Sequence, residues 1–191
     1  MKKAELRRIY TERRRSITPV TRSGLCLKIA KNLFARVDFA ALQVINCYLE
    51  IEWEVETRPI LDALRNSHPL VVITAPRINP LTGDLEPVRY DRGTVLVQGP
   101  WQILEPQGPP VDPDQIDLVI IPLLCVDTRG HRVGYGKGFY DRFLSRCRPD
   151  CIKAGLSFFP PVETIEDVHQ GDIALDLCVT PDGIFDFTTA T

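Results

Sequence analysis

Hydrophobic and polar positions along the chain alternate between helical and strand spacing. Residues 3–14 contain no proline or glycine and carry apolar side chains at helical intervals, which predicts a short amphipathic helix. Thr18 has the character of an N-cap with Pro19 at the first helical position, and apolar residues then recur every fourth position. A second, stronger helix is therefore predicted after Thr18, and residues 59–66 predict a third.

Apolar runs between and after these helices predict strands. Residues 42–49 are strand-like, and residues 70–74 form a mostly apolar run expected to be buried on both faces. Residues 117–124 make the clearest buried strand, and residues 151–157 and 175–180 complete the predicted sheet. Strands that alternate with helices in this way indicate an α/β fold.

The middle of the chain has a different character. Residues 76–116 hold eight of the sixteen prolines together with four glycines, which excludes long helices there. Residues 88–90 and 94–97 fit edge strands or a hairpin, and residues 106–113 fit a surface loop. We interpret 76–116 as an insertion beside the main sheet of a single domain that spans residues 1–191.

Composition narrows the class of protein. With 44% hydrophobic and 25% charged residues, the chain is neither disordered nor fibrous. No apolar stretch approaches the roughly 20 residues that span a bilayer, and no apolar segment precedes Pro19, so we expect neither a membrane protein nor a secreted one. The six scattered cysteines form no CxxC pair and are expected to be reduced thiols of a cytoplasmic protein. Cys147 and Cys151 lack the further ligands of a zinc site, so they are interpreted as packing residues.

Charge is concentrated at the N-terminus. The formal net charge is −2, yet residues 1–15 carry +5 and the remaining residues −7. Such a basic segment fits a nucleic-acid arm, a solvated helix face or a clamp for a small polyanion. Aromatic residues other than Tyr10 are not interleaved with the basic ones, which disfavours the nucleic-acid interpretation.

A glycine-rich loop follows the clearest buried strand and precedes a helix predicted over residues 138–147. Glycines at alternate positions let the backbone approach a ligand and direct successive N–H groups at one anion. They are Gly134, Gly136 and Gly138. Arg132 and Lys137 add positive charge, and Asp141 is suited to hold a divalent cation near phosphates. The loop is neither a Walker A motif nor GxGxxG, so the glycines alone leave a structural turn open, but strand, loop and helix together favour a nucleoside triphosphate clamp.

Several separated motifs together match one known family. They are Lys3-Ala-Glu-Leu-Arg7, Tyr48-Leu49 with Glu54-Val-Glu-Thr57, Pro76-Arg77, Pro122-Leu-Leu-Cys-Val-Asp127, Gly130-His-Arg132, Gly134-Tyr-Gly-Lys-Gly-Phe-Tyr-Asp141 and Asp176. In these positions the chain resembles the 5-formyltetrahydrofolate cyclo-ligases, also called methenyltetrahydrofolate synthetases, over nearly its whole length. It departs from them at Tyr135, where some members have arginine, and at Lys137, where many have glycine.

The resemblance implies both a fold and a reaction. The fold would be a mixed, mostly parallel sheet flanked by helices, related to the ribose-phosphate isomerase and CoA-transferase group. The reaction would close 5-formyltetrahydrofolate, or its polyglutamates, to 5,10-methenyltetrahydrofolate with ATP and Mg²⁺, giving ADP and phosphate. A non-catalytic folate- or nucleotide-binding paralogue, and a different ATP-dependent ligase or kinase, remain open alternatives. We expect a monomer that binds neither nucleic acid nor membranes.

The resemblance also implies roles for individual residues. Lys137 and Arg132 would be catalytic, and Asp141 and Asp176 would ligate Mg²⁺. The ATP-binding residues would be Lys3, Arg7, Arg132, Val133, Gly134, Tyr135, Gly136, Lys137, Gly138, Phe139 and Tyr140. The folate-binding residues would be Leu49, Glu54, Trp101, Tyr135 and Phe139. Arg77, at the end of a predicted strand, fits an anion contact and a surface ion pair equally well.

Overall fold

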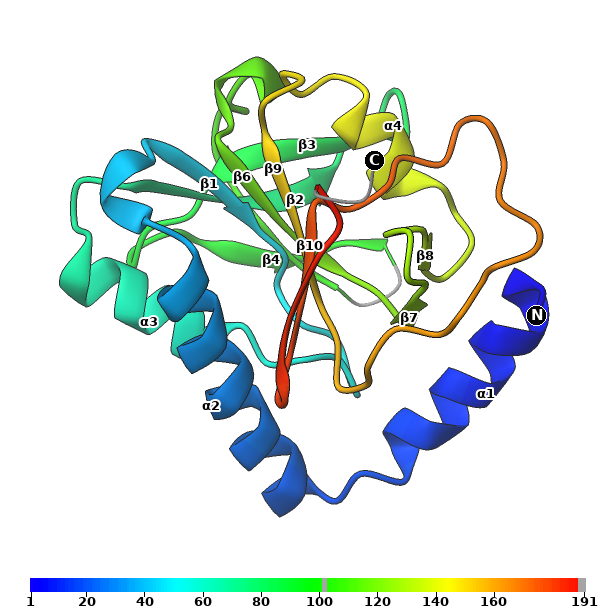
Figure 1. Ribbon diagram of the computed structural model, residues 1–191. Coiled ribbons are helices and arrows are strands. Elements are labelled where there is room, and N and C mark those ends of the chain that lie inside the picture. Colours follow the sequence, from blue (N-terminus) through cyan, green and yellow to red (C-terminus); the bar gives the residue numbers. More distant parts are fainter. Residues whose placement is uncertain (101–102, 189–191) are drawn as a thin grey trace.

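The computed structural model describes residues 1–100 and 103–188, and within them the main element is one seven-stranded sheet (Figure 1). Its order is β11-β10-β9-β6-β1-β2-β3. The bounds are β1 Val44–Cys47, β2 Val72–Ile78, β3 Leu85–Arg89, β6 Leu118–Pro122, β9 Ile152–Leu156, β10 Leu177–Thr180 and β11 Gly183–Asp186. The inner strands pair in parallel, and β3 and β11 pair antiparallel at the two edges, so the mixed, mostly parallel sheet is confirmed.

The strand order reverses between β1 and β6. From β1 the chain adds β2 and β3 on one side, and it then returns to place β6 on the other side of β1. Ile45 of β1 lies opposite Leu118 of β6, which in turn lies opposite Ile152 of β9. Ligands of open α/β sheets bind at such a reversal, beyond the carboxyl ends of the strands. The topology therefore directs attention to the segments that follow Cys47 and Pro122.

Helices cover both faces of the sheet. They are α1 Lys3–Arg15, α2 Pro19–Arg36, α3 Arg58–Ser67 and α4 Phe139–Leu144, with short 3₁₀ segments at Phe39–Ala41 and Pro113–Gln115. Leu118 and Ile120 of β6 face the core formed with α2 and α3, whereas Val119 and Ile121 face the core formed with α4. Because β6 is buried on both faces, its sequence is a continuous apolar run.

The first helix lies apart from these two layers, beside a small antiparallel pair formed by β7 Cys125–Val126 and β8 Arg132–Val133 (Figure 1). Leu6 and Tyr10 of α1 pack with Leu124 and Val133 in a third apolar cluster. The predicted cap of the next helix is confirmed, since the side chain of Thr18 accepts a hydrogen bond from the backbone of Thr21 at 3.3 Å. The basic helix is thereby packed against the segment that leads into the glycine loop.

Some predicted bounds were wrong. Leu70 is 94% exposed, and the strand begins only at Val72. Part of the range 76–116 is not an insertion, because β2 continues to Ile78 and pairs with β3 inside the main sheet. The rest contains a separate antiparallel pair, β4 Leu96–Gln98 with β5 Leu104–Pro106. The prolines had indicated a segment outside the sheet. An edge strand tolerates proline, however, because the backbone groups on its outer side need no hydrogen-bond partner in the sheet.

The helix after the glycine loop is shorter than predicted. It spans Phe139–Leu144 and not 138–147, because the next backbone N–H groups bond three residues back, from Arg146 to Phe143 and from Cys147 to Leu144, each at 3.1 Å. Such bonds tighten and end a last turn. All six cysteines are free thiols. Among the helices of the described residues, none has the length and apolar character needed to cross a bilayer.

Candidate active site

The N-terminal helix lies directly against the glycine loop. The Nε atom of Arg7 donates a hydrogen bond to the carbonyl oxygen of Gly134 at 2.9 Å. Gly136 has φ +89°, and a Cβ atom built there would lie 3.1 Å from Nη2 of Arg7. Glycine at this position therefore allows both a left-handed backbone and the close approach of a guanidinium. Arg7 and the glycine loop, which the sequence places in different parts of the chain, are therefore in direct contact.

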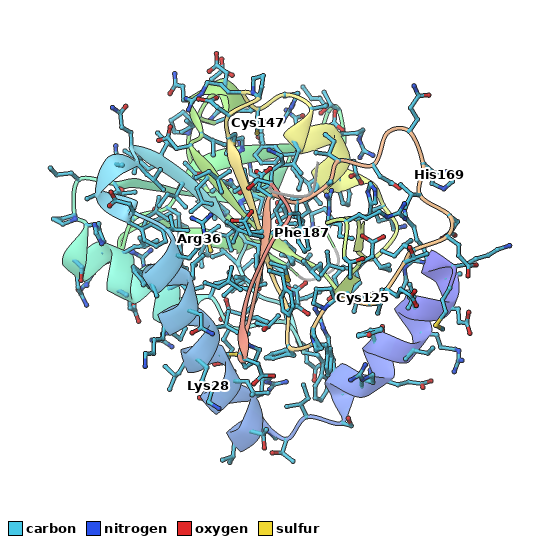
Figure 2. The ribbon with its side chains drawn as sticks, viewed as in Figure 1. Lys28, Arg36, Cys125, Cys147, His169 and Phe187 are labelled. Atoms are coloured by element: carbon cyan, nitrogen blue, oxygen red, sulfur yellow. The ribbon has the colours of Figure 1, made fainter. Side chains whose placement is uncertain are left out.

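Lys3 is anchored by acidic residues that sequence reasoning did not single out. Its ammonium group forms an ion pair with Asp172, and its backbone N–H donates to Oδ1 of Asp167 at 2.6 Å. The loop that carries both aspartates runs beside the amino end of α1, where Figure 2 shows His169. Lys3 and Arg7 are both on α1 as expected, but Lys3 is held by the loop that carries Asp167 and Asp172.

Arg132 and Asp141 form an ion pair at the base of the glycine loop. Nη2 of Arg132 lies 2.6 Å from Oδ1 of Asp141, and the same oxygen accepts the backbone N–H of Ile173 at 3.1 Å. The Arg132 side chain is only 7% exposed and also donates to the carbonyl oxygen of Ile173. Burial lowers the pKa of Arg132, while the charges of Asp141 and Asp172 act in the opposite direction. The pair thus joins β8 to the first turn of α4.

The two candidate magnesium ligands belong to separate ion pairs. Asp141 pairs with Arg132, whereas Asp176 lies 2.9 Å from Nζ of Lys153 and accepts the backbone N–H of Lys153 at 2.7 Å. Within residues 1–100 and 103–188, no group of three or more acidic, cysteine or histidine side chains is assembled to hold a metal ion. Mg²⁺ commonly uses only one or two carboxylates and takes its other ligands from phosphates and water. Asp141 lies beside the glycine loop and therefore fits a magnesium site of this kind. Asp176 fits it less well, because its contacts are to Lys153 of strand β9.

A buried carboxylate follows β1 at the strand-order reversal. Glu54 is 4% exposed and accepts the backbone N–H of Ile51 at 3.0 Å. It comes directly after Trp53, whose φ of +72° is unusual for a bulky residue and turns the chain inward. Burial raises the pKa of Glu54 to about 7, against the lowering effects of the Ile51 hydrogen bond, the charge of Arg14 and a hydrogen bond with Tyr135. The Tyr135 hydroxyl therefore connects the glycine loop to this carboxylate.

Arg14 is a site residue that sequence reasoning missed. It is 2% exposed, its Nη1 lies 3.5 Å from the Tyr135 hydroxyl oxygen, and its Nη2 donates to the carbonyl oxygen of Leu123. The signal was present in the sequence, because Arg14 falls four residues after Tyr10 and eight after Leu6, on the buried face of the helix. The helix prediction placed the basic residues beside the apolar stripe, whereas Arg14 lies within that stripe.

The family follows from these features and a comparison with known proteins. A sequence model of the 5-formyltetrahydrofolate cyclo-ligase family matches residues 1–181. The chain belongs to this family.

Individual cyclo-ligases are similar over most of the chain. The 5-formyltetrahydrofolate cyclo-ligase of Escherichia coli strain K12 is 25% identical over 182 residues, which cover 92% of this chain and 98% of that protein. The Mus musculus 5-formyltetrahydrofolate cyclo-ligase is 27% identical over 153 residues, which cover 76% of this chain and 74% of that one. The NMR structure of Aquifex aeolicus 5,10-methenyltetrahydrofolate synthetase superposes with a TM-score of 0.85 at 26% identity, covering 100% of this chain and 95% of that chain. The structure of a 5,10-methenyltetrahydrofolate synthetase from Mycoplasma pneumoniae superposes with a TM-score of 0.77 at 23% identity, and this similarity supports the fold alone.

The remaining residues of the cyclo-ligase motif differ in exposure. Val133 is fully buried, so its side chain supports the loop from beneath. Tyr140 is partly buried, and burial raises its pKa well above the ordinary value, with the charge of Glu54 adding to that effect. Phe139 and Leu49 pack on opposite core clusters, and Trp101 lies outside the described residues.

Two further charged residues have structural partners. Arg77 forms an ion pair with Glu86 on the neighbouring strand β3, which corresponds to the ion-pair interpretation. Asp127, which sequence reasoning did not weigh as a separate residue, is fully buried and accepts backbone N–H groups of Arg129, His131 and Ile165 at 2.9, 3.0 and 3.1 Å. Its carboxylate therefore holds the turn between β7 and β8, and so positions Arg132 at the start of the loop.

Proposed function

We propose that this chain converts 5-formyltetrahydrofolate to 5,10-methenyltetrahydrofolate with ATP and Mg²⁺, giving ADP and phosphate. The observation that carries the proposal is the hydrogen bond from Arg7 to Gly134, which places a cationic helix on a glycine loop. Through Tyr135 the same loop reaches the buried carboxylate of Glu54. The proposed phosphate-binding backbone and a buried polar cluster therefore share one loop, as a transfer between nucleotide and folate requires.

The phosphate side consists of the loop backbone and its cations. The N–H groups of residues 133–140 and the guanidinium of Arg7 would bind the triphosphate, with Lys3 one turn away on the same helix. Lys137 and Arg132 would stabilise charge on the transferred phosphoryl group, Arg132 from its ion pair with Asp141. Asp141 would hold Mg²⁺, which supplies neutralising charge to the phosphates; Asp176, bound to Lys153, is the weaker candidate ligand.

The folate side would be the region around Glu54. Its carboxylate would accept hydrogen bonds from the N–H groups of the pterin ring, and Leu49 would supply an apolar contact; Phe139, which packs on the other core cluster, is the weaker candidate. Tyr135 belongs to both sides because its hydroxyl reaches Glu54 while its backbone is part of the glycine loop. Trp101 is retained as a candidate ring contact because an indole offers an aromatic face to the pterin ring.

The reaction requires positioning and electrostatic stabilisation, and no enzymic nucleophile. The formyl oxygen is a poor leaving group until it receives the terminal phosphoryl group of ATP. N10 of the folate then attacks the activated formyl carbon, and the C–O bond breaks as phosphate departs. The chain's task is to hold the phosphoryl group in line with the formyl oxygen and to neutralise charge as it moves. The cations around the glycine loop suit that task.

A spectroscopic assay tests the proposal. The methenyl product has a conjugated chromophore that the substrate lacks, so near-ultraviolet absorbance should rise only when protein, 5-formyltetrahydrofolate, ATP and Mg²⁺ are all present. Arg7→Ala should abolish or strongly slow this rise. Arg8→Ala is the matched control, because Arg8 is exposed and its ion pair is with the exposed Glu12 at 3.7 Å. Absence of a rise with wild-type protein that binds folate in calorimetry would identify a non-catalytic binding protein instead.

A further inference from the structure

Arg14 occupies a position at which the helix would ordinarily bury an apolar side chain. It continues the stripe of Leu6 and Tyr10 on the face of α1 that packs against the β7–β8 pair. Its guanidinium reaches the carbonyl oxygen of Leu123, at the carboxyl end of the central strand β6, and the hydroxyl of Tyr135 in the glycine loop. One side chain of the N-terminal helix thus contacts two segments that border the candidate folate pocket.

Stability alone does not account for a charge at this position. Removing a guanidinium from water costs several kcal/mol, and well-packed apolar residues often replace buried ion pairs without loss of stability. The Nε atom of Arg14 is buried and finds no hydrogen-bond partner among the described residues. A buried polar group left without a partner in a native structure calls for an explanation, and service to a functional site is one. The nearby negative group that this charge favours is the carboxylate of Glu54.

We propose that Arg14 is a positioning residue of the folate pocket, which holds the Tyr135 hydroxyl and the Leu123 carbonyl in place beside the buried Glu54 that would receive the pterin ring. This inference deepens the proposed function and rests on it. The N-terminal helix would then serve both substrates, with Arg7 toward the phosphates and Arg14 toward the folate. The two residues are seven positions apart, two turns along the same helix.

The groups that face Glu54 come from four parts of the fold. Arg14 comes from α1, Tyr135 from the glycine loop and Tyr140 from α4. Tyr48 and Glu50 come from the segment after β1. Arg14 is the main positive charge acting on Glu54, whereas Glu50 and burial favour the protonated form. Loss of Arg14 should therefore raise the pKa of Glu54 above its present value of about 7.

Steady-state kinetics of two variants test the proposal. Arg14→Gln should raise KM for 5-formyltetrahydrofolate about tenfold, as expected for loss of a charge-assisted contact, and leave KM for ATP within about twofold. The acid limb of the pH profile for folate binding should move to higher pH. Arg14→Lys keeps the charge and should restore the pH profile, but not the full affinity, because an ammonium group lacks the planar fork. Arg15→Gln is the control, since Arg15 is the exposed neighbour on the same helix.

A double-mutant cycle separates positioning from a purely structural effect. In a Glu54→Gln background the carboxylate is absent, so Arg14→Gln should add less than about a twofold further increase in KM for folate. An undiminished tenfold increase in that background would overturn the proposal. So would failure of both Arg14→Gln and Arg14→Lys to fold, because Arg14 would then be a structural residue.

A readout without substrate keeps this test apart from the proposed reaction. The carboxyl carbon of Glu54 can be titrated by ¹³C NMR in wild type and Arg14→Gln, with Glu54→Gln identifying the signal. A higher titration midpoint in Arg14→Gln supports the inference even if the wild-type protein proves inactive. Equal midpoints would refute it even if the wild-type protein is an active cyclo-ligase.

Discussion

Nη2 of Arg132 and Oδ1 of Asp141 lie 2.6 Å apart, and this ion pair joins the strand before the glycine loop to the helix after it. The loop therefore spans two points that are held together, and its glycines need not fix its shape alone. Asp141 consequently has a structural partner as well as a proposed metal.

Replacing Asp141 separates these two roles. Asp141→Asn should destabilise the fold by about 2 kcal/mol, because a hydrogen bond to the buried Arg132 cation loses its charge. It should also raise the Mg²⁺ concentration that gives half-maximal activity. Urea unfolding and a magnesium titration measure the two effects, with Asp150→Asn as a control at an aspartate whose side chain is 75% exposed. Loss of stability with an unchanged magnesium titration would remove Asp141 from the metal site.

Gly136 should be far less replaceable than Gly134 of the same loop. Gly136→Ala imposes a φ of +89° on a residue with a Cβ atom and displaces the Arg7 guanidinium. We expect a loss of about 1–2 kcal/mol in the free energy of unfolding and a higher KM for ATP. Gly134→Ala is the matched control for stability, because a Cβ there has no neighbour within 4 Å and no positive φ is involved. Equal destabilisation by the two substitutions would contradict this explanation.

Glu54 should make stability depend on pH in an unusual direction for a carboxylate. Its folded pKa of about 7 exceeds the ordinary value of 4.5, so the folded state keeps the proton longer than the unfolded state. Stability should therefore fall as pH rises from about 4.5 to about 7. Glu54→Gln should match wild type near pH 4.5 and exceed it by about 3 kcal/mol above pH 7. Parallel stability curves for the two proteins, obtained by urea unfolding, would show that Glu54 is already ionised.

Cys147 should react with iodoacetamide before the other cysteines. Its pKa is lowered by a hydrogen bond with the Cys151 thiol and by the charges of Arg146, Lys153 and Arg148, and it lies partly exposed after α4 (Figure 2). Burial raises the pKa of Cys125 to about 12, so that thiol should remain unmodified in the folded protein. Peptide mass spectrometry after brief labelling at pH 7.5 measures the order. Faster labelling at Cys125 would contradict the packing of α1 against β7.

Local patterns predicted elements whose causes are local. Thr18 and Pro19 define the start of α2 through capping chemistry, and the apolar run 117–124 indicated β6 because a strand buried on both faces carries few polar residues. The prediction that 76–116 is an insertion was wrong at its start. Prolines restrict the backbone both in an edge strand and in a loop outside the sheet, so they do not distinguish the two. Only pairing with β2 decides that β3 belongs to the sheet.

The sequence by itself determined the α/β class, the order of most elements and the resemblance to one family, since these depend on spacing along the chain and on motifs; the phosphate-binding chemistry of the glycine loop stays a prediction. The tertiary structure decided which distant groups meet. It placed Arg7 on Gly134, Lys3 on Asp172, and Arg14 between Leu123 and Tyr135. It also buried Glu54 at the strand-order reversal and so raised its pKa. Burial and electrostatic coupling depend on three-dimensional proximity, and a basic residue in a helix pattern does not reveal which buried group it will face.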